Sequence, residues 1–392
     1  MTQGRRLVLA ALLGSMSAIH SCADRNSTRS AEIGASHARS VPELDALFHR
    51  EPRWLGADAA LTIPLSSDRI LWLFGDTFVA TSDSLRRTES RMPRNTIAIQ
   101  EGRDPRSARI SFHWGRNGRG EPDSFFPNAG ERFFWPGHGV RFENGPLVIF
   151  LFGIVSTPGV GLGFDAAGRA LAVIDNPDDP VDRWSMRIVD APKDPFDAVP
   201  ALAVVREGEF VVGLATKQYG VHAGALVRYP AATLAKGSLD GEQWWAGESR
   251  GWVPADTLGA EGPAFVIDDA GAECSIHWEP RADSFVHVAS YGFGASTIGV
   301  RTAPKLTGPW SEPTIVFRPP ECDLPKPFVY AAKAHPELVA AGEHDLLVTY
   351  ASNSFDFAEL VSPEGTKRLY WPRFVAVPIG PGGDFESAPT GP

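Results

Sequence analysis

Short runs of apolar residues, each bounded by polar or glycine-containing turns, recur along most of the chain. Runs of this length that are bounded by turn residues are typical of β-strands. Each run is preceded by another short apolar segment and a polar turn, which indicates a β-hairpin. The five runs are residues 71–76, 147–153, 210–216, 285–291 and 346–352, and their turns are 66–69, 143–145, 206–208, 281–283 and 341–343.

The spacing of these hairpins predicts the fold. One marker residue from each second strand gives intervals of 76, 62, 75 and 61 residues, each long enough for a four-stranded sheet with its loops. Five antiparallel sheets of this kind predict an all-β five-bladed β-propeller, in which radial packing hides the faces of every sheet. A β-sandwich is the alternative, but it gives no reason for the hairpin to recur. The markers are Phe74, Phe150, Val212, His287 and Val348.

The N-terminal region predicts export. An apolar run at residues 7–19 follows two arginines and is shorter than the roughly 20 residues that span a bilayer, so residues 1–22 are interpreted as a signal peptide. Cys22 ends a segment that resembles a lipoprotein processing box, although His20 is atypical there. The protein is therefore expected to be lipid-anchored at the cell envelope through Cys22 or, if this cysteine is unmodified, simply secreted.

After this segment we expect a flexible tether at residues 23–40, followed by a single propeller domain at 41–392. Only residues 42–49 and 231–236 carry short helical signals, and the remainder is predicted to be strand and turn. The 39 glycines, 33 prolines, 23 phenylalanines and 11 tryptophans agree with many short strands joined by tight turns.

The net charge of the protein excludes some classes of binding partner. With 37 Lys and Arg against 47 Asp and Glu, the net charge is -10, which disfavours nucleic acid and anionic membranes as partners. A polysaccharide or oligosaccharide is expected instead, bound by a monomer. Export would place Cys274 and Cys322 in an oxidising environment, where they could form a disulfide.

Motifs for other chemistries are missing from the sequence. It contains no nucleophile elbow, no phosphate-binding loop and no His or Cys pattern typical of zinc sites. The acidic segment 175–182 could hold calcium, but its spacing matches no EF-hand, so a solvated turn is the preferred interpretation. No cofactor or catalytic metal is therefore expected.

Hairpin geometry brings two acids together. If strands at residues 58–64 and 70–76 pair, facing positions sum to about 134, and Asp58 lies opposite the region of residues 75–77, which includes Asp76. Facing or diagonal residues lie about 4.5 to 8 Å apart, so the two carboxylates should have different pKa values, as acid/base chemistry requires. The alternative interpretation is that each aspartate only caps a turn.

In a propeller, equivalent ends of the innermost strands face one funnel, so polar residues at these ends are candidate site residues. Glu273 lies within an otherwise apolar strand at residues 272–276, where an unpaired carboxylate would be costly. It is therefore a third candidate acid unless it pairs with a nearby Lys or Arg. Trp54 and Trp135 are candidate platforms for sugar rings, with the hydrophobic core as the alternative for each. The remaining candidates for substrate binding are His138, Tyr291, Lys333, His335 and Asn353; for the two histidines the alternative is a structural hydrogen bond.

Several segments together resemble a known family. They are Trp54-Leu55-Gly56-Ala57-Asp58, Leu71-Trp72-Leu73-Phe74-Gly75-Asp76-Thr77, Asn95-Thr96-Ile97, Glu273-Cys274-Ser275-Ile276, residues 303–311 and residues 333–337. The stretch from about 54 to 377 resembles a bacterial propeller family long classed as of unknown function, whose characterised members are endo-D-arabinanases of glycoside hydrolase family 183. The resemblance implies a five-bladed propeller with Asp58 and Asp76 as the catalytic pair, and it adds Asn95 to the substrate-binding candidates. Ala57 and Ala59 stand where glycine is common, which suggests a subfamily with another substrate.

The leading hypothesis is an exported glycoside hydrolase that acts on a polysaccharide such as an arabinan or another furanoside. Asp58 and Asp76 would supply the carboxylate pair, and Glu273 would adjust a pKa or donate a proton. A non-catalytic glycan-binding or scaffold lipoprotein on the same fold is the alternative. A lyase that uses His335 with Lys333, or Tyr291, as its base is a further one.

Overall fold

The computed structural model describes residues 37–158, 163–192, 194, 196, 198–217, 221–339 and 345–389. The predicted signal peptide with Cys22, the first part of the predicted tether and the turn at 341–343 lie outside the described residues. Within the described part, five antiparallel sheets of four or more strands follow one another along the chain. We number these sheets as blades 1 to 5 and give their strands from the axis outwards.

Blade 1 consists of β3 (Leu61–Pro64), β4 (Arg69–Phe74), β7 (Thr96–Glu101) and β8 (Arg109–His113). Blade 2 consists of β11 (Phe133–Arg141), β12 (Leu147–Ser156), β13 (Phe164–Ile174) and β14 (Met186–Ala191). Blade 3 consists of β15 (Ala198–Glu207), β16 (Phe210–Lys217), β17 (Gly224–Pro230), β18 (Gln243–Trp245) and β19 (Trp252–Val253), with β20 (Phe265–Ile267) also on β17. Blade 4 consists of β21 (Cys274–Glu279), β22 (Ser284–Tyr291), β23 (Thr297–Ala303) and β24 (Thr314–Phe317). Blade 5 consists of β25 (Pro327–Ala334), β26 (Asp345–Ser354), β27 (Pro372–Pro378) and β1 (Arg39–Ser40).

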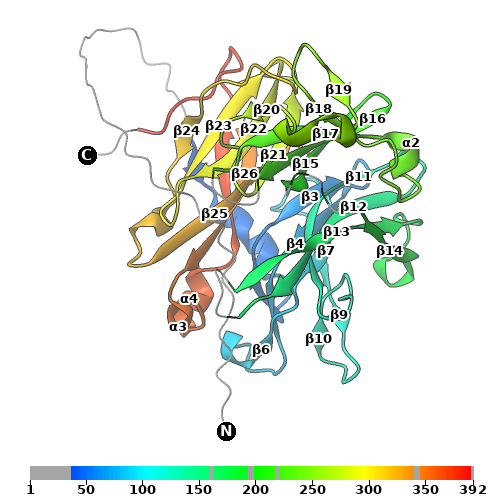
Figure 1. Cartoon of the computed structure of the whole chain (residues 1–392). Helices are drawn as coiled ribbons and strands as arrows, with labels where there is room; N and C mark the ends of the chain where they lie inside the picture. The colour runs from blue at the N-terminus through cyan, green and yellow to red at the C-terminus, as the bar shows by residue number, and fades with distance from the viewer. Residues whose placement is uncertain are drawn as a thin grey trace, which may run out of the picture.

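The first strands of the blades surround one axis. β3 contacts β11, β11 contacts β15, β15 contacts β21, and β21 contacts β25 (Figure 1). Thr62 of β3 hydrogen-bonds to His335, directly after β25, and this contact completes the circle. The predicted five-bladed β-propeller is confirmed, and each of the five predicted second strands, from β4 to β26, is the second strand of its blade.

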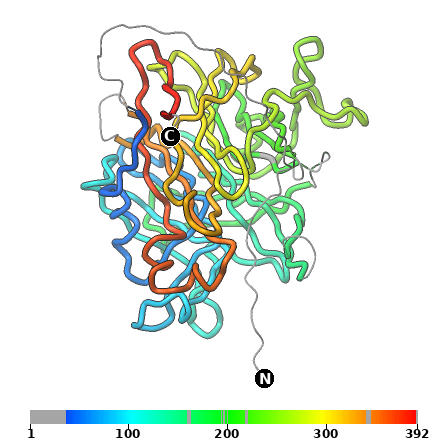
Figure 2. The backbone as a smooth tube through the Cα atoms, turned by 90° about the vertical axis from the view of Figure 1, so that its left-hand side faces the viewer, coloured from blue at the N-terminus to red at the C-terminus, as the bar shows by residue number. Residues whose placement is uncertain are grey.

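The N-terminal and C-terminal ends of the domain contribute strands to the same blade, which closes the ring of blades. β1 pairs with β27, so the outermost strand of blade 5 comes from the N-terminal side of the domain. The first and last parts of the coloured chain accordingly run side by side in Figure 2. Arg39 and Ser40 therefore belong to the last blade, and the predicted tether boundary at residue 40 is corrected to a point before β1.

The predicted register of the first hairpin is confirmed, but its first strand is shorter than expected. Leu61 faces Leu73 and Thr62 faces Trp72, which gives the predicted sum of 134. The strand begins only at Leu61 because Ala59 and Ala60 have left-handed backbone angles, with φ of 64° and 56°. The segment before this bend is β2 (Trp54–Ala57), which pairs in a separate sheet with β5 (Thr77–Ala80); β5 in turn pairs with β6 (Ser90–Arg91).

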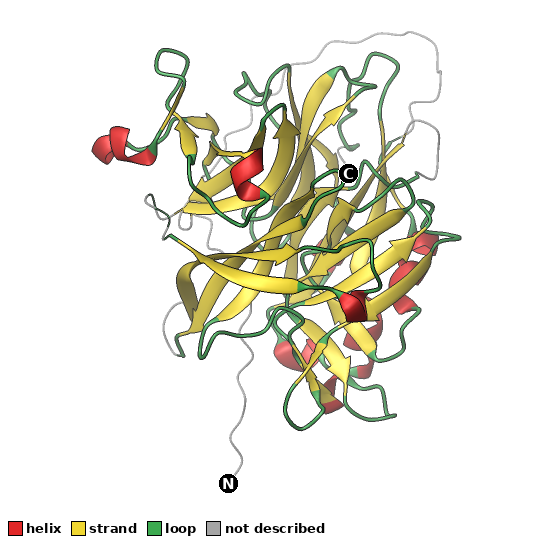
Figure 3. Ribbon diagram, turned by 90° about the vertical axis from the view of Figure 1, so that its right-hand side faces the viewer, coloured by secondary structure: helices red, strands yellow, loops and turns green. Residues whose placement is uncertain are grey.

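The two predicted helices are present as α1 (Pro42–Asp45) with the 3-10 turn η1 (Ala46–His49), and as α2 (Ala231–Leu234). Two further helices, α3 (Phe357–Leu360) and α4 (Pro363–Arg368), lie where strand and turn were predicted. Both are too short to show a helical period, and each begins at a side-chain cap, Asp356 and Ser362 respectively. β18 and β19, followed by the 3-10 turns η4 (Ala255–Thr257) and η5 (Gly259–Glu261), form an arm that projects from blade 3 (Figure 3).

The remaining short elements are the 3-10 turns η2 (Arg87–Glu89), η3 (Val181–Arg183) and η6 (Pro320–Asp323), and the hairpin of β9 (Gly115–Arg116) and β10 (Pro122–Asp123). Cys274 and Cys322 carry free thiols, so the proposed disulfide is wrong. The physical reason is that Cys274 packs in the cluster between blades 3 and 4, whereas Cys322 packs between blades 4 and 5. Over the residues described, no helix is long and apolar enough to cross a membrane.

Candidate active site

One end of the propeller collects the polar ends of its inner hairpins. In an antiparallel hairpin, the residue before the first strand lies beside the residue after the second. Asp58 precedes β3 by three residues, Glu273 immediately precedes β21, and Trp135 lies near the start of β11. Asp76 follows β4 and therefore lies at the same end. We call this end the mouth.

A buried chain of hydrogen bonds fixes the turn that carries Asp76. The Thr77 hydroxyl donates to the carbonyl of Gly75 at 2.8 Å and lies 2.9 Å from the hydroxyl of Thr96. The Trp54 indole N–H donates to the same Thr96 hydroxyl at 3.2 Å. Trp54 is fully buried among core aromatic rings, so its prediction as a sugar platform is wrong. Instead, its indole supports the turn from beneath.

Asp58 is held by two tyrosines of blade 5. The hydroxyls of Tyr330 and Tyr370 donate to Asp58 Oδ2 at 2.8 and 3.1 Å. Gly75 lies so close that a Cβ there would be 2.3 Å from Asp58 Oδ1. Burial, followed by the charges of Glu273 and Asp76, raises the pKa of Asp58 to about 8, against the weaker opposing effect of the two tyrosines.

Asp76 has a different environment. Arg94 donates to Asp76 Oδ2 at 3.0 Å, and the indole N–H of Trp135 donates to Oδ1 at 3.0 Å. Burial raises the pKa of Asp76, while the Arg94 charge and both hydrogen bonds oppose that rise. Of the two aspartates, only Asp76 has a cationic partner among the described residues. Their surroundings therefore differ in the way that one proton-donating and one ionised carboxyl group require.

Glu273 forms an ion pair, as its alternative interpretation stated. Lys333 Nζ donates to Glu273 Oε2 at 2.6 Å, to the carbonyl of Ala59 at 2.9 Å and to that of Ala331 at 3.1 Å. The Glu273 side chain is 28% exposed, whereas that of Lys333 is 2% exposed. Lys333 therefore orients Glu273 and the Asp58 bend from behind, and its predicted contact with substrate is corrected to this buried role.

Asn95 is a structural residue, contrary to its predicted role in substrate binding. It is fully buried, its carboxamide oxygen accepts from the Phe126 N–H at 2.7 Å, and its amide nitrogen donates to the carbonyls of Phe126 and Phe134. All of these partners are main-chain groups, so Asn95 ties two loops together and presents no free group to a ligand.

Both histidines are structural as well, as their alternative interpretation stated. His335 lies between the hydroxyls of Thr62 and Thr349 at 2.6 and 2.7 Å, and burial lowers its pKa to about 3. His138 donates from Nε2 to the carbonyl of Thr62 and accepts at Nδ1 from the Val204 N–H. All four ring nitrogens have partners within the protein, three of them in other blades and one, Thr349, in the same blade as His335. Neither histidine therefore presents a free nitrogen to substrate, and the lyase hypothesis loses His335 as its base.

Of the other candidates, Tyr291 packs within blade 4. Its hydroxyl accepts from Arg301 Nε at 3.1 Å, and a Cβ at Gly299 would meet its ring. Asn353 is buried and hydrogen-bonded to Tyr330, so it supports the tyrosine and is not placed to bind substrate directly. Trp135 is the one predicted aromatic residue that reaches a carboxylate.

Sequence reasoning missed Tyr330, Tyr370 and Arg94. Arg94 directly precedes the Asn95-Thr96-Ile97 segment, and this position was its only signal in the sequence. The two tyrosines lie 272 and 312 residues from Asp58, and no periodicity links positions so far apart.

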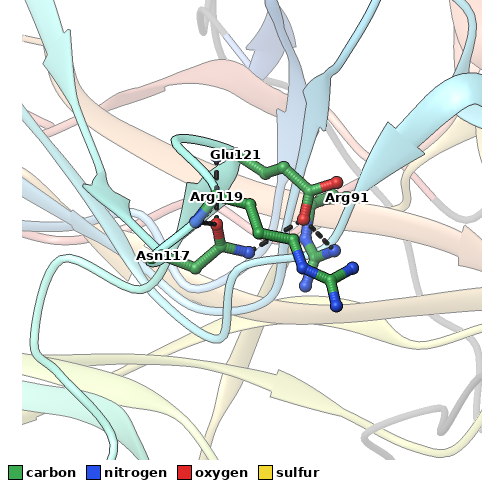
Figure 4. Close-up of a pocket in the computed structure, with 5 residues that line it drawn as sticks. Arg91, Asn117, Arg119 and Glu121 are labelled. Carbon is green, nitrogen blue, oxygen red and sulfur yellow. Dashed lines mark hydrogen bonds and ion pairs between the residues drawn. The ribbon is translucent and has the colours of Figure 1, made fainter.

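A small pocket of about 420 Å³ lies on the β9–β10 hairpin and is lined by Arg91, Asn117, Gly118, Arg119 and Glu121 (Figure 4). In it, Arg91 and Asn117 both donate to Glu121 Oε2, at 2.8 and 2.9 Å. None of the three mouth carboxylates lines this pocket.

The residues described contain no cluster of three or more His, Cys, Asp or Glu side chains that could hold a metal ion. In the acidic segment considered for calcium, Asp175 pairs with Arg187 and Asp178 pairs with Arg141. These carboxylates have cationic partners within the protein.

Comparison with solved structures supports the fold. A candidate hydrolase from Bacteroides ovatus superposes with a TM-score of 0.66 at 17% identity, over 86% of this chain and 89% of its own. A protein of unknown function from Dyadobacter fermentans gives a TM-score of 0.50 at 11% identity, over 87% and 97% respectively. A xylan β-1,4-xylosidase from Bacillus halodurans gives 0.44 at 10% identity, over 86% and 56%. At identities this low, the first two superpositions establish a shared fold and no more.

None of the curated proteins matches the chain in sequence. A family model does match it, over residues 42–379, which is nearly the whole propeller. The resemblance to family 183 arabinanases is not confirmed by this match. The chain belongs to the family described as a domain of unknown function, DUF5005.

Proposed function

We propose that this protein is an exported glycoside hydrolase that cleaves a polysaccharide, with arabinans and other furanosides as the first substrates to test. The observation that supports the proposal is the set of three carboxylates at the mouth. Two of them, Asp76 and Glu273, have cationic partners, whereas Asp58 is held only by neutral donors. Glycoside hydrolysis needs one protonated and one ionised carboxyl group at neutral pH.

Asp58 is proposed as the proton donor. With a pKa of about 8 it remains protonated at neutral pH. Both tyrosine hydroxyls use Oδ2, and no donor among the described residues reaches Oδ1, which is therefore the oxygen that carries the proton. The donated proton would neutralise the departing glycosidic oxygen as the C–O bond breaks.

Glu273 is proposed as the carboxylate that acts on the other side of the sugar, because it is the most exposed of the three acids. Asp76, fixed by Arg94 and Trp135, supplies a fixed negative charge that stabilises the oxocarbenium-like transition state. Asp58 and Glu273 belong to blades that are not neighbours, and Lys333 of blade 5 lies between them. We propose that this placement leaves room for an attacking water between the two acids, which would give inversion at the anomeric carbon.

The test uses purified protein with arabinan, fructan, galactan and glucan, followed by analysis of the released sugars. D58N and D76N should each lower sugar release at least about a hundredfold, since each removes a group that acts in the transition state. D83N is the matched control, because Asp83 lies just beyond β5, which follows Asp76, and its side chain is 98% exposed. Circular dichroism verifies that the variants fold.

Near-normal turnover in both variants would contradict the catalytic assignment. A wild-type protein that binds a polysaccharide but releases no sugar would point instead to a glycan-binding protein. Proton NMR of the first product separates the mechanisms, because inversion is expected for the Asp58–Glu273 pair, and retention would assign the reaction to the Asp58–Asp76 pair of the first hairpin.

We also propose lipid anchoring through Cys22. Its test is incorporation of a labelled fatty acid, which should occur in the wild type and disappear in C22S. Unlabelled wild-type protein would contradict the anchor.

A further inference from the structure

Two phenylalanines are exposed at the mouth, where neither was expected from the sequence. Phe293 lies in the loop between β22 and β23 and is 45% exposed, and Phe355 follows β26 and is 44% exposed. Their rings lie 5.5 Å apart, so they form one apolar surface. Contiguous apolar surface that a soluble protein leaves exposed can mark a ligand-binding groove.

This surface is connected to the catalytic centre by ring contacts. Phe355 lies 4.9 Å from Phe328, and Phe328 stacks on Tyr330 at 4.5 Å with an interplanar angle of 19°. The hydroxyl of Tyr330 donates to Asp58. A polymer chain that leaves Asp58 along blade 5 would therefore pass the two phenylalanines.

The backbone around both rings is fixed before any ligand binds. The Phe355 N–H donates to the carbonyl of Lys326 at 3.1 Å, and the Val329 N–H donates to the carbonyl of Gly294 at 2.8 Å. Gly294 has a φ of 78°, and a Cβ there would lie 3.3 Å from the carbonyl of Pro327. Both loops are thus attached to β25, so little conformational entropy is lost on binding.

The charges beside this surface cancel. Lys326 pairs with Asp356 at 2.9 Å, directly next to Phe355 in the chain. An anionic sugar would find no unpaired cation in this pair, whereas a neutral sugar offers an apolar C–H face to the rings and hydroxyls to the rim. Aromatic rings provide rigid contact area of this kind at low entropic cost.

We propose that Phe293 and Phe355 form a subsite that stacks a neutral sugar unit of the polysaccharide, a few units from the bond at Asp58. The inference rests on the proposed function for the choice of ligand. According to this inference, blades 4 and 5 recognise the polymer, and the substrate is a neutral glycan.

The experiment measures binding in the D58N variant, which keeps both phenylalanines but cannot consume its ligand. Native gels containing soluble arabinan, fructan, galactan or glucan report binding as retarded migration. Adding F293A and F355A together should weaken the affinity for the retarding polysaccharide at least about tenfold, because the bound sugar no longer covers the apolar surface of two half-exposed rings. Adding W278A is the matched control, because Trp278 is 42% exposed and lies at the opposite end of blade 4.

Unchanged retardation of the double phenylalanine variant overturns the proposal, as does a D58N protein that none of the four polysaccharides retards. Light scattering adds a further test: a wild-type dimer that F293A/F355A converts to a monomer would show that a second copy covers the surface, which also overturns it. Failure of the hydrolase proposal can be distinguished from failure of the subsite proposal. A wild type that binds polysaccharide through the phenylalanines yet releases no sugar contradicts only the hydrolase. Hydrolysis with an unchanged KM in F293A/F355A would overturn the subsite alone.

Discussion

Asp58 shows how a single side chain acquires its function from its neighbours. Its carboxyl group is buried, it faces two other acids, and its hydrogen bonds come from neutral tyrosines. The ionised form therefore lacks the compensation that Arg94 gives to Asp76. The cost of ionising Asp58 in the folded protein is what keeps a proton available at neutral pH.

This raised pKa predicts a pH-dependent stability. Asp58 ionises near pH 8 in the folded protein, against 3.8 for an ordinary aspartate, so its contribution to stability is complete below about pH 4 and is lost as the pH rises through 8. D58N cannot ionise. The free energy of unfolding of D58N relative to wild type should therefore increase between pH 5 and 8, by up to about 1.4 kcal/mol per pH unit.

Urea unfolding of both proteins at pH 5, 6, 7 and 8 measures this difference. The comparison removes the effect of other groups, such as Asp45, whose pKa is raised to about 6 by burial and which titrates equally in both proteins. A difference that stays constant across the range would show that Asp58 is already ionised.

Gly75 offers a second test at the residue scale. G75A places a Cβ 2.3 Å from Asp58 Oδ1, closer than any real contact, so the carboxyl group or the turn must shift. We expect a loss of about 1–3 kcal/mol in stability and a much lower rate of sugar release. G118A is the control, because a Cβ at Gly118 meets nothing within 4 Å. Equal activities of the two variants would show that Asp58 has freedom to move.

At the scale of elements, a buried arginine joins the loops of blades 1 and 5. Arg87, at the start of η2, donates to the carbonyls of Leu55, Leu360 and Leu369 at 2.6 to 3.0 Å. Burial lowers its pKa to about 9, since no carboxylate among the described residues pairs with it. Leu369 precedes Tyr370, so Arg87 fixes α3, α4 and the tyrosine that donates to Asp58.

Removing this arginine should therefore affect both stability and the site. R87M leaves three carbonyl groups without their donor, and we expect a loss of at least about 2 kcal/mol in the free energy of unfolding. Because Tyr370 loses its anchor, the apparent pKa of Asp58, followed by ¹³C NMR of labelled aspartate, should also change. R53M is the control, since the Arg53–Asp83 pair is exposed and should contribute almost nothing. If the apparent pKa of Asp58 in R87M equals that in the wild type, Arg87 has only a structural role.

At the scale of the whole molecule, stability depends on closing the ring. β1 completes blade 5, Arg39 pairs with the buried carboxylate of Asp345 at 2.8 Å, and Val41 is buried against the core. The same segment thereby ties blade 1, which follows it in the chain, to the blade that ends the domain.

A comparison of two shortened chains tests this closure. A chain that begins at Pro42 lacks β1 and Val41, whereas one that begins at Ala38 retains them. The shorter chain should be less stable by about 2–4 kcal/mol, because it loses the burial of a valine and leaves Asp345 unpaired. Thermal unfolding of both chains gives the measurement, and equal midpoints would show that blade 5 is stable with three strands.

The local sequence determined the hairpins. Apolar runs and the polar turns between them indicated each hairpin, because strand pairing across a short turn involves only neighbouring residues. The five hairpins, their spacing and the facing of Leu61 with Leu73 could therefore be predicted. The placement of Asp58 near Asp76 followed from the same hairpin, and the Asp76 charge contributes to the raised pKa of Asp58. The same logic predicted a partner for Glu273 without identifying Lys333.

Only the tertiary structure decided which groups face each other across the axis. Tyr330 and Tyr370 reach Asp58 because ring closure brings blade 5 beside blade 1, and no local pattern encodes that rotation. The burial of individual residues could not be predicted from the sequence either. Trp54 and Asn95 resemble ligand-binding residues in sequence, yet the packing of neighbouring loops covers both. The exposed Phe293 and Phe355 were missed for the converse reason, since an apolar residue reveals its exposure only when every surrounding blade is in place.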